Sequence, residues 1–300
     1  EIKVNDNLSV NGYAVGSYQY FDPKPGDSTD TFQVDTALLG STISFKPVTG
    51  VLSLLYTPNV TNEVTLLDAY VTYDLGSGSS LTAGKFLSYL GYESFYPIYM
   101  DQISYANGQF LAPIPGYHTG VRYDYSSDAI AAGIAGVDSV YSPFGATKGD
   151  GELQHNGGME AFLSYKAVKN LTLWFGLAYD TKGGFQPHSV TTYDVWASYT
   201  VSPTLRIAGE YVYKDGGTGA TGYNWLTFAD LATSGKFSTA FRISGESMKD
   251  GGPSFTKYTI CPAITATANL TVRAEYSYID YSDFSVESAN FFGVQVLFKF

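Results

Sequence analysis

Apolar and polar residues alternate with a period of two along most of the chain, and turn residues separate the alternating runs. In the range 270–278, for example, every second residue is apolar. The ranges 171–180 and 204–214 repeat this pattern. Because successive side chains of a β-strand point to opposite faces, the pattern predicts strands with one apolar and one polar face.

Sixteen runs can be delimited: 8–20, 32–45, 50–57, 64–74, 80–87, 117–126, 129–137, 157–166, 170–180, 190–200, 204–213, 223–232, 236–247, 255–265, 269–281 and 289–300. Their connections alternate between short turns and longer loops, which is typical of bacterial outer-membrane barrels. We therefore predict an all-β fold, a transmembrane antiparallel up-and-down β-barrel of about 16 strands. It would form a single domain over residues 1–300.

A soluble β-sandwich would also show alternation, but it gives no reason for connections that alternate so regularly in length. Composition favours the membrane barrel, because charged residues make up only 15% of the chain and aromatic residues 16%. No stretch approaches the 18 apolar residues that indicate a transmembrane helix. A barrel of sixteen strands is wide enough for an aqueous channel. The predicted function is passive diffusion of small hydrophilic solutes and ions across the outer membrane of a Gram-negative-type bacterium.

The net charge of −11 argues against a nucleic-acid partner, which leaves the lipid bilayer and small hydrophilic solutes as the expected partners. The acidic residues concentrate in the long loops, which carry thirteen carboxylates and five lysines on the predicted boundaries. The short turns carry Lys46, Lys166, Lys169 and Lys236 against Asp128. Because a vestibule of one sign concentrates ions of the other, we expect a modest preference for cations.

The segment 88–116, between the fifth and sixth runs, is the longest connection and is rich in Tyr and Phe. Loops of this length are usually functional, and these aromatic side chains need burial. We expect the segment to fold into the barrel and narrow it, although an external cap is the alternative. Glu93 and Asp101 would then face basic residues of the wall across a constriction: Lys85, Arg122, Arg206, Arg242 and Arg273.

Acidic residues share the predicted inward faces with these cations: Asp68, Asp124, Glu160, Asp194, Glu210, Glu246 and Glu275. Glu210 follows Arg206 by four positions, and Glu246 follows Arg242 by four. Such pairs could line a wet channel or could brace the wall as salt bridges.

Two further functions are alternatives to a general pore. Trp174 and Trp196 are predicted to face inward and could stack sugar rings, which would make the channel carbohydrate-selective. Some outer-membrane barrels are hydrolases, but the three histidines, His118, His155 and His188, accompany no Gly-x-Ser-x-Gly elbow and no metal-ligand spacing. We therefore expect no enzymatic activity, no catalytic residue, no cofactor and no metal, and Cys261 would be an inward-facing thiol.

Two stretches resemble a known family. The sequence Gly84-Lys85-Phe86, the loop start Gly91-Tyr92-Glu93 and the re-entry His118-Thr119-Gly-x-Arg122-Tyr123 are similar to outer-membrane porins of the OmpL-like β-barrel porin-2 type. The resemblance implies passive solute diffusion.

The chain end alternates apolar residues up to a terminal phenylalanine, similar to the insertion signature of outer-membrane barrels: Phe292, Val294, Val296, Phe298 and Phe300. Sixteen-strand porins are commonly trimers, so a homotrimer is one candidate assembly. Pro262 lies inside a predicted strand and removes a ladder hydrogen bond there, which suggests either a bulge or misplaced strand boundaries.

Overall fold

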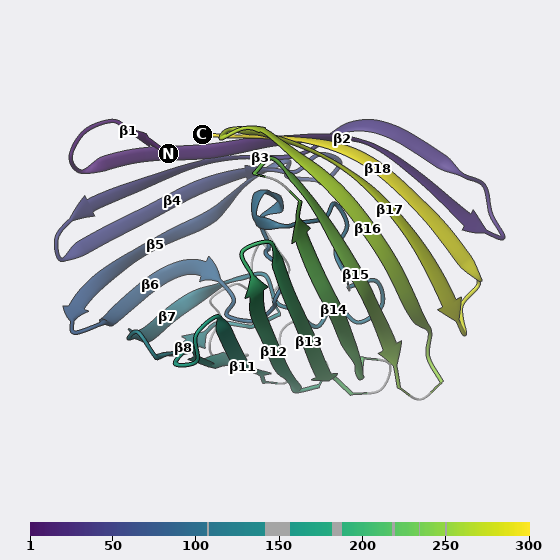
Figure 1. The fold of residues 1–300 in the computed structure, drawn as a ribbon. Helices are drawn as coiled ribbons and strands as arrows, with labels where there is room; N and C mark the ends of the chain where they lie inside the picture. Colours follow the sequence, from purple (N-terminus) through teal and green to yellow (C-terminus); the bar gives the residue numbers. More distant parts are fainter. Residues whose placement is uncertain (107, 142–156, 182–187, 218–219, 234, 250) are drawn as a thin grey trace.

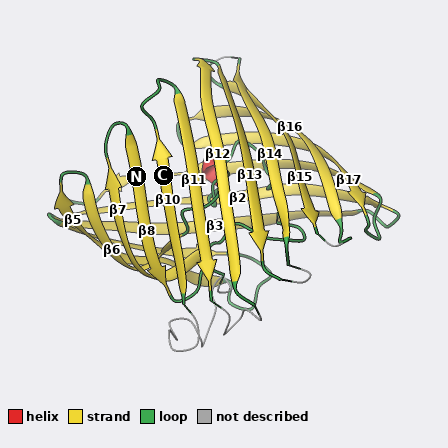
Figure 2. Ribbon diagram, turned by 90° about the horizontal axis from the view of Figure 1, so that it is seen from below, coloured by secondary structure: helices red, strands yellow, loops and turns green. Residues whose placement is uncertain are grey.

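The computed structural model describes residues 1–300 except 107, 142–156, 182–187, 218–219, 234 and 250. Sixteen antiparallel strands close into a barrel. Figures 1 and 2 show its shape from two directions. The strands are β2 (Leu8–Lys24), β3 (Thr29–Phe45), β4 (Val48–Tyr56), β5 (Val64–Gly76), β6 (Ser79–Leu87), β7 (Tyr117–Ser126), β8 (Ile130–Val137), β10 (Gly158–Tyr165), β11 (Leu171–Asp180), β12 (Val190–Ser202), β13 (Leu205–Asp215), β14 (Gly222–Ala232), β15 (Phe237–Met248), β16 (Ser254–Thr267), β17 (Leu270–Ser282) and β18 (Ser288–Lys299).

The barrel closes where its last strand, β18, pairs with its first strand, β2. β18 pairs with β2 from Ser288↔Lys24 to Lys299↔Tyr13, and both termini lie on the same rim (Figure 1). A short extra strand, β1 (Ile2–Lys3), pairs with β2. The prediction of a sixteen-strand up-and-down barrel is therefore confirmed.

Helix is nearly absent from the described part of the chain. It consists there of one 3₁₀ turn, η1 (Pro97–Tyr99). Among the described residues, no helix has the length and apolar character needed to cross a membrane.

Two details of the predicted strands need correction. The first connection, expected over 21–31, is only four residues, because β2 runs to Lys24 and β3 begins at Thr29. Ladder hydrogen bonds come from the backbone, so a strand can continue through polar residues that resemble a loop.

The bulge suggested at Pro262 is absent, because Pro262 pairs with Thr239 in the unbroken register of β15 and β16. In the pairing of β16 with β17, Ile260 and Ala263 have the same register on either side of Pro262. The register shift of this pairing lies between Thr265 and Thr267. Proline therefore removes a donor here without changing the register.

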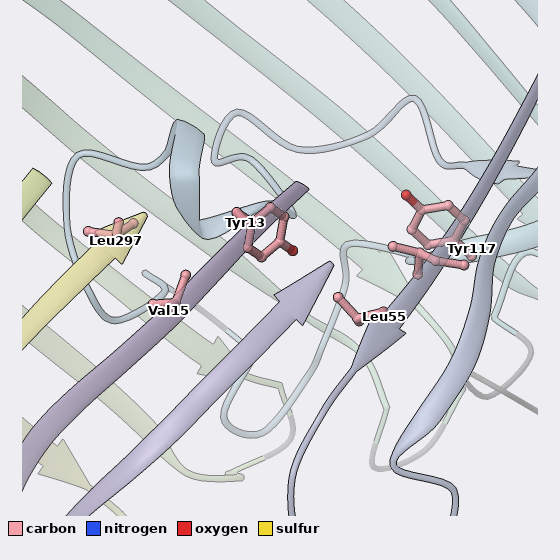
Figure 3. Packing of buried hydrophobic residues seen from close by; sticks show 6 residues of the cluster. Tyr13, Val15, Leu55, Tyr117 and Leu297 are labelled. Atoms are coloured by element: carbon pink, nitrogen blue, oxygen red, sulfur yellow. The ribbon is translucent and has the colours of Figure 1, made fainter. Parts of the chain in front are cut away.

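Buried apolar residues form four clusters in the described part of the chain, and side chains of the segment 88–116 belong to or pack against each of them. One cluster joins Tyr13, Val15 and Leu297 to Leu55 and other residues, as Figure 3 shows, and Phe95 and Tyr96 pack against it. Several aromatic residues of the segment thus pack against the wall, whereas Tyr99 and Tyr105 remain exposed.

Candidate functional site

The two faces of the wall differ sharply in chemistry. On β12 and β13 the side chains of Val195 and Tyr211 are each 48% exposed. Their neighbours Asp194 and Glu210 are 0% and 6% exposed. We call the face with the exposed apolar side chains the outer face and the opposite one the inner face. A belt of exposed apolar groups is stable against hydrocarbon and costly against water, so this arrangement fits a bilayer.

Carboxylates of the inner face accept hydrogen bonds from the backbone of the segment 88–116. Glu160 accepts from Tyr89 N at 3.1 Å, and Asp194 accepts from Gly91 N at 2.8 Å. Glu210 accepts from Tyr92 N. These acids come from β10, β12 and β13, which are far from the segment in sequence.

Two further acids hold the second half of the segment. Glu246 on β15 accepts from the backbone N–H groups of Gly108, at 2.9 Å, and Phe110, at 2.6 Å, and also from Leu111. Glu275 on β17 accepts from Ile103 N at 2.6 Å and from Ser104 N at 3.0 Å. Buried peptide N–H groups need acceptors, and ionised acceptors make the stronger bonds.

Basic side chains of the inner face contact the same segment through its oxygen atoms. Arg273 donates to Met100 O at 2.6 Å, and Lys257 donates to Tyr105 O at 3.2 Å. Lys214 donates to Leu111 O at 3.1 Å. The inner face therefore supplies anions for the N–H groups of the segment and cations for its carbonyl groups.

Both predicted acids of the segment meet a predicted cation of the wall. Glu93 forms an ion pair with Arg242, and Asp101 forms one with Arg206. The Arg242–Glu93 pair is almost fully buried, whereas about a third of each side chain is exposed in the Arg206–Asp101 pair.

The other predicted cations are arranged differently. Arg122 pairs with Asp124, Nε to Oδ2 at 3.2 Å, and lies over the ring of Phe86. Lys85 was predicted to face inward, but it pairs with Thr119 and shares the side of β6 that carries exposed Leu81. This places Lys85 on the outer face and corrects the prediction for that residue.

The predicted pairs within single strands are not the contacts that form. Arg242 reaches Glu93 while Glu246 accepts backbone N–H groups, and Arg206 reaches Asp101 while Glu210 does the same. Buried peptide N–H groups need acceptors, so Glu210 and Glu246 bind the backbone of the segment instead of the arginine on their own strand. The alternation within one strand does not reveal this need.

The remaining inward acids accept hydrogen bonds from hydroxyl groups. Asp124 accepts from Tyr89 OH at 2.7 Å. Asp68 accepts from Tyr96 OH at 3.2 Å and from the hydroxyl of Ser53. Every acid predicted on the inner face is thus found there, with a partner from the segment or from a neighbouring side chain.

The two predicted tryptophans lie on the inner face within a stack of rings. Trp174 is parallel to Phe162 on one side, at a centroid distance of 4.3 Å, and to Trp196 on the other, at 5.3 Å. Tyr92 contacts Trp196 edge-on at 5.5 Å. Because neighbouring rings cover both faces of Trp174, the stack gives no support to sugar stacking on that residue.

Some residues that hold the segment were missed by the sequence analysis. Lys257 is buried on the inner face, and its alternation with exposed Tyr258 and Ile260 could have revealed it. Lys214 follows the predicted strand 204–213, yet β13 continues to Asp215.

His118 is also buried, with Nε2 3.3 Å from Glu160 Oε2. The predicted inward thiol, Cys261, is buried as expected. His188 is exposed, and His155 lies outside the described residues. In the described residues, no group of three or more His, Cys, Asp or Glu side chains could hold a metal ion.

The C-terminal residues form the strand that closes the barrel. Phe292, Val296 and Phe298 are exposed on the outer face of β18. The backbone of Phe300 exchanges hydrogen bonds with Gly12, N to O at 3.0 Å and 3.1 Å.

Comparisons with known proteins agree with this architecture. The family model described as beta-barrel porin-2, OmpL-like, matches residues 7–300. No curated protein sequence matches the chain.

Among solved structures, the chain is similar to OprB of Pseudomonas putida, with 12% identity, coverage of 98% of this chain and 94% of that chain, and a TM-score of 0.78. An anion-selective porin from Comamonas acidovorans has 12% identity, coverage of 98% and 99%, and a TM-score of 0.72. The outer-membrane protein OmpT of Vibrio cholerae, in a trimer form, has 14% identity, coverage of 98% and 100%, and a TM-score of 0.66. At these identities the likeness concerns the fold.

The family match extends over nearly the whole chain, and the closed barrel has an apolar outer belt and a charged interior. The chain therefore belongs to the beta-barrel porin-2, OmpL-like family, whose members are porins of the outer membrane.

Proposed function

We propose that this protein lets small hydrophilic solutes and ions diffuse passively across the outer membrane through the interior of its barrel. The observation that carries the proposal is the distribution of side chains over the two faces. Apolar groups such as Val195 are exposed on the outer face, while acidic and basic groups such as Glu160 and Arg242 are on the inner face. Sixteen strands enclose an interior wide enough for water.

We further infer that the segment 88–116 narrows this interior. Its contacts with the inner face support this, because they come from β10, β12, β13, β15, β16 and β17 on one side and from Asp68 of β5 on another. A segment that reaches all these strands leaves less of the cross-section open. The charges of Asp101 and Arg206 remain partly exposed and could act on passing ions.

A modest preference for cations is part of the proposal. It is supported by the net charge of −11 and by the excess of acidic residues in the longer loops. Negative potential at a mouth raises the local concentration of cations and lowers that of anions.

The direct test is single-channel recording of the purified protein in planar bilayers. We expect discrete conductance steps in KCl and, in a salt gradient, a reversal potential on the cation side. Swelling of liposomes in neutral sugars of increasing size would measure the width of the path. A folded protein that inserts without conducting would contradict the channel function. A reversal potential of the sign expected for an anion-selective pore would contradict only the preference for cations.

The exposed apolar belt also permits association between barrels, and we propose a homotrimer. The trimer form of the similar OmpT structure supports this assembly. Light scattering of the detergent complex, with the detergent mass subtracted, would distinguish a trimer from a monomer of 32.5 kDa.

A further inference from the structure

Basic residues are distributed unequally around the barrel. From Pro25 to Gly84 the chain contains a single basic residue, Lys46, which lies in the turn between β3 and β4. The strands β3, β4 and β5 therefore contain no lysine or arginine, and β2 contains only Lys24 at its end. On the other side of the barrel, inward cations such as Arg242 and Lys257 contact the segment 88–116.

Two cavities lie between the segment and this wall of β2 to β5. The first, of about 310 Å³, is lined by Gln19, Gln33 and Asp35 among others. The second, of about 510 Å³, is lined by Ser53 and Asp68 among others.

Tyr13 lines both cavities, and in Figure 3 it lies beside the helical turn of the segment. Residues 95, 97 and 100 line the first cavity, and residues 96, 98 and 99 line the second. The two cavities thus follow one another along the same wall, and Tyr13 marks the place where they adjoin.

In each cavity one inward carboxylate of the wall, Asp35 or Asp68, accepts hydrogen bonds from neutral donors. Asp35 accepts from Ser17 Oγ at 2.7 Å, Gln33 Nε2 at 2.9 Å and Gln295 Nε2 at 2.7 Å. Asp68 accepts from Tyr96 OH and from Ser53. These donors fix the carboxylates in place without neutralising their charge.

Two basic residues lie near the cavities, behind the wall or at the rim. Arg273 lies behind Gln295, and it donates to Gln295 Oε1 at 2.8 Å and to Met100 O. Lys299 lines the second cavity near Asn269, at the rim of the short turns. Apart from Glu1 and Lys299 near the chain ends, the polar side chains that line the two cavities are therefore hydroxyl and amide groups and the carboxylates Asp35 and Asp68, and apolar residues such as Leu55 complete the lining.

We propose that ions cross the barrel between the segment 88–116 and the wall of β2 to β5. Asp35 and Asp68, which lie in series on either side of Tyr13, make this route selective for small cations. This inference rests on the proposed channel function. Fixed carboxylates in a narrow aqueous path attract cations and repel anions, and neutral hydroxyl and amide groups replace part of the hydration shell of the ion.

The test uses the full chain in planar bilayers with a KCl gradient. The variants are Asp35→Asn, Asp68→Asn and the double variant, with Asp128→Asn in the turn between β7 and β8 as the matched control. We expect the permeability ratio of K⁺ to Cl⁻ to fall about threefold or more in the double variant and less in each single one. The control should retain the wild-type ratio. An unchanged ratio in the folded double variant would overturn the inference.

A second measurement keeps the inference testable if Asp68→Asn does not fold. Gln33→Cys places a thiol in the first cavity, while the native Cys261 is buried. A positively charged methanethiosulfonate reagent should reduce the current of Gln33→Cys and leave the wild type unchanged. If the reagent modifies the thiol without affecting the current, the route lies elsewhere. A wild-type protein that does not conduct would instead refute the channel function itself.

Discussion

The guanidinium group of Arg242 on β15 donates to the carboxylate of Glu93, which lies 149 positions earlier in the segment 88–116. The same guanidinium donates to Ser104 O at 2.8 Å, and Glu93 also accepts from Ala106 N at 2.7 Å. This pair therefore ties two separate stretches of the segment to one strand of the wall. Charged groups of the interior therefore hold the segment against the wall.

Removing one member of this pair should destabilise the barrel strongly. We expect Arg242→Met to lower the free energy of unfolding by roughly 3–5 kcal/mol, because it leaves the Glu93 carboxylate nearly buried without its cation. Combining Arg242→Met with Glu93→Gln should recover part of the loss. Urea unfolding in lipid vesicles, followed by tryptophan fluorescence, measures both effects, and additive losses would show that the pair is not coupled.

Glu246 should control how tightly the end of the segment is held. In Glu246→Gln the side chain keeps one acceptor oxygen, while in the wild type the two carboxylate oxygens serve Gly108, Phe110 and Leu111. We expect hydrogen exchange at these amides to accelerate by about tenfold or more, since each lost charged hydrogen bond contributes roughly 1.5–3 kcal/mol. Asp128→Asn is the control, and equal exchange rates in both variants would contradict this role.

A charged substitution should destabilise the folded barrel more on the outer face than on the inner face. We expect Val195→Arg to destabilise the folded barrel by about 2–4 kcal/mol, because the side chain would face hydrocarbon. Thr172→Arg, on the inner face of the neighbouring strand, should cost much less. Unfolding titrations in vesicles compare the two, and equal costs would argue against a lipid-facing outer surface.

Phe300, the last residue of the predicted insertion signature, should matter for insertion in cells. We expect Phe300→Ala to lower the amount of folded protein in the outer membrane several-fold, while the purified chain still refolds in detergent. The backbone hydrogen bonds between Phe300 and Gly12 do not depend on the side chain, so the barrel can still close. Heat-modifiable migration in gels measures both quantities, and Phe298→Ala serves as the control. Equal losses in cells and in detergent would indicate a purely structural role.

The strands and their faces could be predicted because alternation is a local property. Arg206, Arg242 and Arg273 share their sides of the strands with buried polar residues, as the period of two requires. Lys85 shows the limit of such prediction, since its charge suggested an inward position while its place in β6 puts it outside. The extent of the first connection was also missed, because polar residues near Lys24 resemble a loop although the backbone continues the ladder.

By itself, the sequence determined the number of strands, their antiparallel order and the chemistry of the two faces, because each depends on neighbours one or two positions apart. Only the tertiary structure decided which charges hold the segment 88–116 and which line the cavities beside β2 to β5. Glu246 and Asp35 both alternate with outward residues, yet one binds peptide N–H groups and the other accepts from Ser17 and Gln295. Gly108 lies 138 positions from Glu246, and Gln295 lies 260 positions from Asp35, so only the closure of the barrel brings these partners together.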